Sequence, residues 1–410
     1  MIRATRTQWI KFAVVLALYL IFLVWLRSWL GLVVVPFIFD AYITKKIPWT
    51  WWRESKNRHV VTVMGWVDAI VFALVAVYFV NLYFFQNYVI PSSSLEKSLL
   101  TGDYLFVSKM SYGPRVPQTP LHMPLAQHTL PFFNCKSYLE HPQWDYKRVK
   151  GLGDVQLNDI VVFNFPAGDT VATGVPNDDI YRLSYGAGKE LAKPVDLASM
   201  TPEQQRVVYD YYYQLGREYL KENPQNFGEI ISRPVDRREN YVKRCVGLPG
   251  QTLEIKDRII YLDGKANKEP DNVQYRYLVK TKRPIPDDLA HELGISKEDM
   301  MMYYTDASVY NMPLTEKAKA GLLARKDIVV SIENTPADDA GGLYPLNMYK
   351  NWTTDNYGPV WIPKKGETVK LTIENLPVYE RPIHVYEGNE LAVKDGKMYI
   401  NCKETEAYTF

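Results

Sequence analysis

The chain has 410 residues and a net charge of +2, so its overall charge gives no signal for nucleic-acid binding, and we expect no such partner. Its three cysteines, Cys135, Cys245 and Cys402, show no CxxC spacing, which argues against a thiolate metal site or a dense set of disulfides. A single disulfide among them remains open.

Two strongly apolar regions lie near the amino terminus, at residues 9–43 and 64–86. About 20 helical residues cover roughly 30 Å, the hydrocarbon thickness of a bilayer, so residues 64–86 are predicted to form a transmembrane helix. Region 9–43 is interrupted by Arg27 and predicts either one long tilted helix or a helix followed by a short re-entrant segment. A cleaved signal peptide is a weaker interpretation, because the apolar run is too long and has no small-x-small cleavage site.

The loop between the apolar regions, residues 44–60, is rich in lysine, arginine and tryptophan. An excess of basic residues marks a cytoplasmic loop, and tryptophan favours the membrane interface. We therefore expect residues 1–87 to form an anchor in a lipid bilayer. The second helix then runs outward, and everything after about Asn87 lies on the extracytoplasmic side.

The remainder predicts a mostly-β domain at 88–266, with a first insert at about 167–238. Alternation predicts a strand over 102–109, proline predicts an extended loop over 113–144, and a β-branched run predicts a buried strand over 158–166. Inside the first insert, Thr201 and the following proline predict the start of a helix that continues over 206–219.

A strand-like run at 241–250 and a hairpin pattern at 253–264 follow the first insert. Residues 267–410 are expected to form a second inserted or accessory region of mixed α/β character. Its patterns predict helices near 287–293 and 315–324, a strand over 368–373, and a hairpin over 391–402 with Asp-Gly at its turn.

The serines that follow the second apolar region are the first candidates for chemistry. Ser94 lies nine residues beyond Phe85, so an extended chain places it at most about 30 Å from the membrane. The sequence contains no HExxH, GxSxG or phosphate-binding GxxxxGK[ST] motif, and its six histidines occupy no recognisable catalytic setting. Nothing in the pattern points to a Ser-His-Asp triad, although its members need not be close in sequence.

A lysine can also activate a serine if burial lowers its pKa enough to make it neutral. Lys243 fits this demand if strand alternation turns it inward among apolar neighbours and turns Arg244 outward; the plain alternative is an exposed strand lysine. A rival arrangement is the S-x-x-K match from Ser94 to Lys97, in which one helical turn would bring the two together. Its partner motifs are missing, since Lys280-Thr-Lys282 lacks the required glycine.

Three segments in order behind the anchor resemble those of type I signal peptidases. The nucleophile segment consists of residues 90–95 (IPSSSL) with 102–109 (GDYLFVSK), and the two further segments are 158–163 (NDIVVF) and 241–250 (YVKRCVGLPG). The resemblance covers about residues 60–112, 154–166 and 239–264, and the long inserts between these segments look like those of Bacteroidetes-type enzymes.

The resemblance implies a serine endopeptidase that removes signal peptides from exported preproteins without a metal or other cofactor. Ser94 would be the nucleophile and Lys243 the general base, and Ser92 with the backbone N–H of Ser94 would form the oxyanion hole. The predicted substrate-binding residues, which line shallow pockets for small residues of the leader, are Tyr88, Ile90, Pro91, Leu95, Leu99, Tyr241 and Val242. The substrate strand is expected to add to a sheet edge beside residues 88–92 and 241–243. The resemblance also implies a location in the bacterial cytoplasmic (inner) membrane, with the catalytic domain, residues 88–266, on the extracytoplasmic or periplasmic side. Contact with the export machinery is a further expectation.

The chain also departs from the family pattern. Leu95 stands where methionine is usual, Lys97 and Ser98 replace Pro-Thr, and the final G-D-N-x-x-x-S-x-D-S-R segment is not found before Phe410. We expect a sequence fragment whose catalytic domain is truncated at its carboxyl end. The alternatives are an inactive or partner-binding membrane protein and, as a weaker hypothesis, an S-x-x-K acyltransferase.

Overall fold

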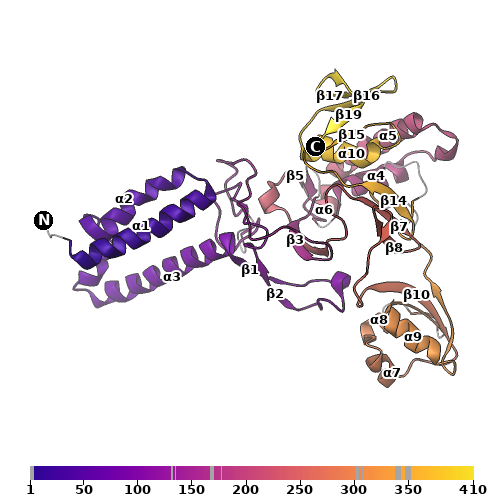
Figure 1. Cartoon of the computed structure of the whole chain (residues 1–410), viewed down its shortest axis with the longest axis horizontal. Helices are drawn as coiled ribbons and strands as arrows, with labels where there is room; N and C mark the ends of the chain where they lie inside the picture. Colours follow the sequence, from indigo (N-terminus) through magenta and orange to yellow (C-terminus); the bar gives the residue numbers. More distant parts are fainter. Residues whose placement is uncertain are drawn as a thin grey trace. The chain divides into compact units, whose positions relative to one another are not determined.

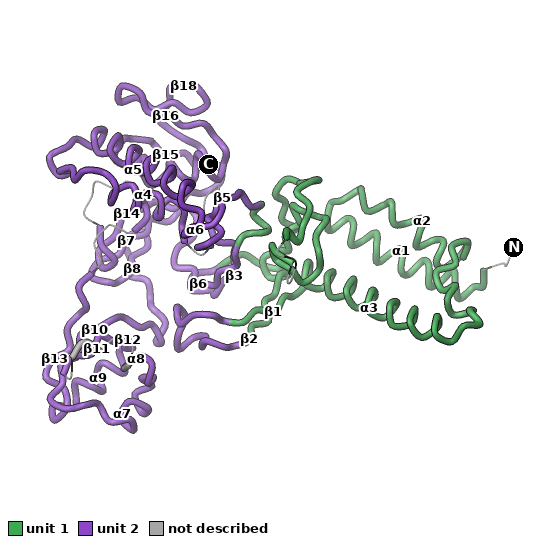
Figure 2. The backbone as a smooth tube through the Cα atoms, turned by 180° about the vertical axis from the view of Figure 1, so that it is seen from behind, with its two compact units in different colours: residues 1–89, 104–155, 234–238 green, residues 90–103, 156–233, 239–410 purple. Residues whose placement is uncertain are grey.

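A computed structural model gives the structure of the chain (Figure 1). It describes residues 4–130, 133, 135–166, 170–176, 178–301, 304–306, 308–337, 343–346 and 352–410. The chain divides into two compact units, which are described separately (Figure 2). Unit 1 consists of Met1–Val89, Tyr104–Val155 and Pro234–Arg238, and unit 2 consists of Ile90–Asp103, Gln156–Arg233 and Glu239–Phe410.

Unit 1 begins with two helices that are long and apolar enough to cross a membrane, α1 (Arg6–Leu26) and α3 (Arg58–Tyr83). The shorter segments between them are η1 (Leu30–Val34), α2 (Val35–Phe39), η2 (Asp40–Thr44) and η3 (Trp51–Glu54). Of the two arrangements expected for residues 9–43, the structure has a helix followed by a shorter apolar piece. The break falls at Arg27, which adopts a left-handed conformation with φ 50° and ends α1.

The boundaries of these helices follow local capping chemistry. Thr5 and Gln8 form a reciprocal capping box at the start of α1, and the Asn57 side chain accepts a hydrogen bond from the backbone N–H of His59 at the start of α3. The two helices pack through aromatic side chains, with the Phe22 ring 5.1 Å from the Phe79 ring. The bundle is visible in Figure 1 as α1, α2 and α3 lying side by side.

The rest of unit 1 is a strand pair and a long irregular loop. Strands β1 (Phe85–Val89) and β2 (Tyr104–Ser108) pair antiparallel, which confirms the strand predicted within 102–109. The described part of the proline-rich loop is extended and contains only isolated β-bridges such as Arg115↔Arg148. Buried Arg237 ties residues 234–238 to this loop, because its Nε donates a hydrogen bond to the Thr119 hydroxyl at 2.6 Å.

Unit 2 contains the predicted strand 158–166 and the run at 241–250 as one antiparallel pair, β3 (Ile160–Asn164) and β6 (Asn240–Arg244). A four-stranded sheet follows in the order β14 (Tyr357–Trp361), β7 (Thr252–Lys256), β8 (Ile259–Leu262) and β9 (Lys265–Ala266). The predicted hairpin is β7–β8, and its turn residues Asp257 and Arg258 both have positive φ, as a two-residue hairpin turn requires.

The second inserted region begins with an α/β module. Its sheet has the order β11 (Tyr304–Asp306), β12 (Val309–Thr315), β10 (Gln274–Thr281) and β13 (Val329–Asn334), and its helices are α7 (Asp287–Glu292), α8 (Lys297–Met301) and α9 (Glu316–Ala324). The core of the module includes Val279, Met312, Leu322 and Ile328, all fully buried. Helices α7 and α9 confirm the helices predicted near 287–293 and 315–324.

The carboxyl-terminal part of unit 2 has a separate core around Leu371, Leu376 and Ile383. Its elements are β15 (Thr368–Lys370), α10 (Leu376–Arg381), η8 (Pro382–Tyr386), β16 (Leu391–Lys394), β17 (Lys397–Ile400), β18 (Lys403–Glu404) and β19 (Ala407–Thr409). The predicted terminal hairpin is β16–β17, and its Asp395-Gly396 turn has positive φ at both residues. The three cysteines are unpaired.

The first insert is mainly a pair of packed helices, α4 (Ile180–Leu191) and α5 (Pro202–Glu222). Its smaller elements are β4 (Val171–Ala172), η5 (Leu197–Ser199), α6 (Pro224–Phe227), β5 (Ile230–Ile231) and, in unit 1, η6 (Val235–Arg237). Thr201 caps α5 as predicted. The two helix backbones approach closely at glycine, because a Cβ on Gly216 would lie 1.7 Å from the Ser184 carbonyl oxygen.

Gly216→Ala is therefore expected to destabilise the α4–α5 pair by about 3 kcal/mol, the scale of overpacking a tight interior. Hydrogen exchange resolved to α4 and α5 in the full chain measures this as faster amide exchange. Gly186→Ala in α4 is the matched control, because a Cβ there meets nothing within 4 Å. Equal exchange in both variants would contradict the close approach.

Candidate functional site

The candidate serines lie in a short closed loop, residues 90–103, which we call the serine loop. Its two ends meet, because the Ile90 N–H donates to the Asp103 carbonyl at 3.0 Å and the Gly102 N–H donates to the Ile90 carbonyl at 2.9 Å. The Asp103 carboxylate accepts a further bond from the Leu100 N–H at 2.8 Å. Ile90 is only 3% exposed, so a buried side chain anchors the start of the loop. These bonds hold the exposed serines on a constrained backbone.

Ser94 lies in a single 3-10 turn, η4 (Ser93–Leu95). The turn ends at Glu96, whose ψ of 147° is extended, and Lys97 follows with φ 67°. The helical turn that the S-x-x-K arrangement requires is therefore not formed. The Lys97 ammonium lies 3.9 Å from the carboxylate of Glu96.

The structure brings Lys243 to Ser94, although 149 residues separate them in the chain. The Lys243 Nζ lies 2.6 Å from the Ser94 Oγ and donates a hydrogen bond to it. Strand pairing positions the lysine, because Lys243 in β6 lies opposite Val161 in β3. Both residues belong to unit 2, so this contact lies within one compact unit.

The environment of Lys243 differs from the one predicted by strand alternation. Lys243 is an exposed residue of β6 and Arg244 is half-buried, so the predicted inward lysine and outward arginine were wrong. The serine loop lies against β6, and the long side chains of both neighbours reach it, which alternation alone does not predict. Partial burial of the Lys243 side chain still lowers its pKa, because a charged ammonium loses hydration there.

The other residues nominated from the sequence occupy varied positions. Ser92 is exposed and extended just before η4, and its hydroxyl does not cap that turn. Pro91 is exposed, while Leu95 and Leu99 are half-buried and are joined by a hydrogen bond from the Leu99 N–H to the Leu95 carbonyl at 2.8 Å. Their assignment to an oxyanion hole or to substrate pockets stays a prediction.

Three further nominated residues lie on strands. Tyr241 and Val242 belong to β6, where the Tyr241 ring stacks on Phe165 with centroids 4.5 Å apart. Tyr88 belongs to β1 of unit 1, and burial raises its pKa to about 12, which keeps the phenol neutral at physiological pH. Ile90 is buried at the base of the serine loop.

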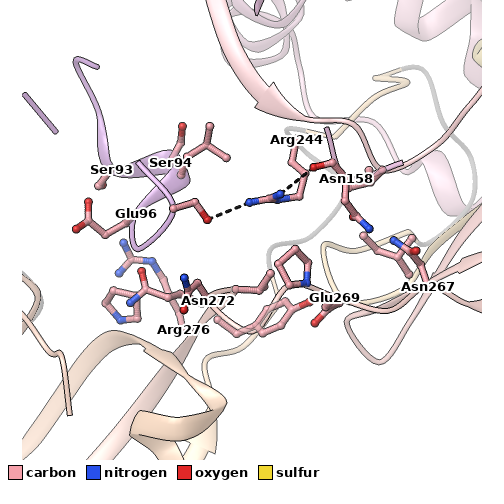
Figure 3. A pocket seen from close by; sticks show the side chains of 18 of the residues that line it. Ser93, Ser94, Glu96, Asn158, Arg244, Asn267, Glu269, Asn272 and Arg276 are labelled. Atoms are coloured by element: carbon pink, nitrogen blue, oxygen red, sulfur yellow. Dashed lines mark hydrogen bonds between the residues drawn. The ribbon is translucent and has the colours of Figure 1, made fainter. Parts of the chain in front are cut away.

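Arg244 braces the serine loop next to Ser94. One guanidinium nitrogen donates to the Ser98 hydroxyl at 2.9 Å, and the other donates to the Asn158 carbonyl at 2.9 Å. The same arginine therefore links the loop to the segment that leads into β3. These two bonds are drawn as dashed lines in Figure 3.

A cavity of about 460 Å³ opens beside Ser94 and is shared between the serine loop and the second inserted region (Figure 3). The serine loop contributes Ser93, Ser94, Leu95, Glu96 and Ser98; the inserted region contributes Asn267, Glu269, Asn272, Arg276, Asp299 and others. The Asn272 side-chain amide donates to the Lys97 carbonyl at 3.0 Å and ties the two walls together. Within the part of the chain that the structure describes, no group of three or more His, Cys, Asp or Glu side chains could hold a metal ion.

Sequence reasoning did not find this wall of the cavity. Asn272 and Lys97 are 175 residues apart, and no local pattern in residues 267–276 indicates proximity to the serines. Arg244 was noticed only as the neighbour of Lys243. Its role as a brace depends on where the serine loop and Asn158 lie, which strand alternation does not contain.

Comparison with known proteins identifies the class. The family model described as "Signal peptidase, peptidase S26" matches residues 63–291, which is more than half of the chain. The matched range contains the serine loop, β6 and the start of the α/β module. The chain therefore belongs to the signal peptidase family, peptidase S26.

Several bacterial proteins named signal peptidase I are similar to this chain. Signal peptidase I P of Bacillus subtilis subsp. natto is 20% identical over 279 residues, which are 67% of this chain and 90% of that protein. Signal peptidase I of Helicobacter pylori is 42% identical over 56 residues, which are 14% of this chain and 18% of that protein. Signal peptidase I of Rickettsia prowazekii is 24% identical over 165 residues, or 37% and 56% of the two chains. No solved structure shows a significant match.

Proposed function

We propose that this chain is a membrane-anchored serine endopeptidase that removes signal peptides from exported preproteins. The observation that carries the proposal is the 2.6 Å contact between the Ser94 Oγ and the Lys243 Nζ. Membership of the signal peptidase family supplies the reaction class, and the contact supplies a nucleophile and a base within hydrogen-bond reach.

In the proposed mechanism, neutral Lys243 accepts the proton of the Ser94 hydroxyl as Ser94 attacks the scissile carbonyl. The protonated lysine then donates that proton to the departing amine, and water hydrolyses the acyl-enzyme through the same base. The lowered pKa of Lys243 supports this role, because a lysine that carries a proton cannot accept another.

The tetrahedral intermediate also needs donors for its oxyanion. We assign this role to the hydroxyl of Ser92 and the backbone N–H of Ser94, and each such donor commonly contributes about 3 kcal/mol to transition-state stabilisation. Ser92 is exposed and extended in the free protein, so its hydroxyl is accessible to an incoming carbonyl. The substrate strand would pair with β6, which among the described strands pairs only with β3.

The anchor gives this chemistry its location in the proposal. Helices α1 and α3 are long and apolar enough to span a bilayer, and the basic loop between them favours the cytoplasm. Ser94 would then lie outside the cytoplasmic membrane, where the cleavage site of a leader peptide emerges. The expected partners are the leader peptide, the surrounding lipid and, less directly, the export machinery.

The test is cleavage of a preprotein by the full chain reconstituted in lipid vesicles. We expect one cut at the end of the leader, identified by amino-terminal sequencing of the product. A penicillin is added in a parallel sample, and no covalent labelling is expected. Intact preprotein under these conditions would favour an inactive or partner-binding protein, and penicillin labelling would favour the acyltransferase.

A further inference from the structure

We infer that the cavity beside Ser94 is a second substrate subsite, which takes a cationic side chain from the first residues of the exported protein. The inference rests on the proposed function and extends it to the preprotein segment that follows the scissile bond. It also gives the α/β module of the second inserted region a role in substrate selection.

The location of the cavity supports a substrate role. Its volume of about 460 Å³ falls within the usual range for binding pockets, and Ser94 itself is part of its lining. The opposite wall comes from the loop between β9 and β10 and from α8, which carries Asp299. A substrate bound at Ser94 would therefore meet the inserted module directly. The hydrogen bond from Asn272 to the Lys97 carbonyl holds this wall in register with the serine loop.

The charge of the lining indicates the kind of side chain. Three carboxylates, Glu96, Glu269 and Asp299, line the cavity with two guanidinium groups, Arg244 and Arg276. Glu96 lies 3.9 Å from the Lys97 ammonium, and Glu269 accepts a hydrogen bond from the Tyr275 hydroxyl. Among the described residues, Asp299 is therefore the lining carboxylate that favours a positively charged occupant.

Two buried acceptor atoms point to the same conclusion. The Asp299 Oδ2 and the Asn158 Oδ1 are buried without a hydrogen-bond partner among the described residues, and both residues line the cavity. Buried polar atoms in proteins nearly always have a partner, either protein or water, so each of these two acceptors can take a hydrogen bond from a donor bound in the cavity. A lysine or arginine side chain supplies only donors and matches this requirement.

The chemistry of preproteins selects which side of the cut enters. A leader consists of a positively charged first segment, an apolar stretch and small residues at its cleavage site. The apolar stretch separates the charged segment from the cut, and a charged cavity of this size is a poor match for the two parts nearer to the cut. The polar chain that begins after the cleavage site can present a lysine or arginine close to Ser94, so we assign the cavity to that side.

The test compares a preprotein that carries lysine with one that carries alanine, at each of the first four positions after the cut. For the full chain in lipid vesicles, we expect kcat/KM to favour lysine at one or more positions by about tenfold, which corresponds to about 1.4 kcal/mol. Asp299→Asn keeps the shape of the side chain and should reduce this ratio to near one. Asp299→Lys should reverse the preference, so that a third preprotein with glutamate at the same position is cleaved faster than the one with lysine.

Asp288→Asn is the matched control, because Asp288 is an exposed acid of α7 in the same module and does not line the cavity. It should retain the lysine preference of the wild type. A wild-type ratio near one at every position, or a preference that Asp299→Asn leaves unchanged, would overturn the inference while the enzyme remains active. Failure of the wild type to cleave any preprotein would instead overturn the proposed function, and the inference with it.

Discussion

Ser94→Ala is expected to lower kcat/KM for a preprotein by about 10⁴-fold or more, the scale seen when a serine hydrolase loses its nucleophile. The reason is geometric, because the Ser94 Oγ is the serine hydroxyl that lies 2.6 Å from the Lys243 Nζ. The measurement is initial-rate cleavage of a preprotein by the full chain in lipid vesicles. Hydrogen exchange of Ser94→Ala and of the wild type verifies that the fold is retained.

Ser93→Ala is the matched control for this experiment. Ser93 is one residue away in the same 3-10 turn, and it contributes a backbone carbonyl to the Glu96 N–H at 3.0 Å. Its backbone bond survives the substitution, so most of the activity should remain. Loss of activity in Ser93→Ala together with full activity in Ser94→Ala would show that Ser93, and not Ser94, is the nucleophile.

Lys243→Met is expected to lower kcat/KM to a similar extent, because methionine keeps a long unbranched side chain and removes the amine that we propose accepts the serine proton. Substrate binding should change little. A full titration of rate against preprotein concentration separates a loss in kcat, which we expect, from a rise in KM. Lys97→Met is the control. It should stay active, because the hydrogen bond to the Ser94 hydroxyl comes from Lys243.

The pH dependence gives the same assignment an independent readout. Lys243 must be neutral to act as a base, so kcat/KM should be low in acid and rise with pH as Lys243 loses its proton. Desolvation lowers the pKa of Lys243, so this rise should occur below the ordinary lysine value of about 10.4. A profile that is flat across this range in the wild type would contradict Lys243 as the base.

The strongest periodic and turn signals were reliable for local structure. The apolar run at 64–86 corresponds to α3, the Thr201 cap begins α5, and the Asp395-Gly396 turn closes β16–β17. Each of these features depends on interactions within a few residues, such as a cap, a turn or one face of a helix. Such interactions can be read from the order of residues alone.

The pairing of Ser94 with Lys243 came from motif resemblance and not from local pattern, and alternation assigned the wrong exposure to Lys243 and Arg244. The reason is that the serine loop lies against β6, so two neighbouring side chains of one strand reach the same loop. Strand alternation describes which face a side chain leaves from. It does not describe which distant segment covers that face.

The sequence by itself therefore determined the apolar helices, the short hairpins, the capped helix of the first insert and the candidate serine and lysine. Tertiary structure alone decided the closed serine loop, the bracing arginine and the cavity shared with the inserted module. Those features join segments as far apart as Lys97 and Asn272, separated by 175 residues. Contacts at that separation form only when several packed elements bring the segments together, and no local propensity encodes them.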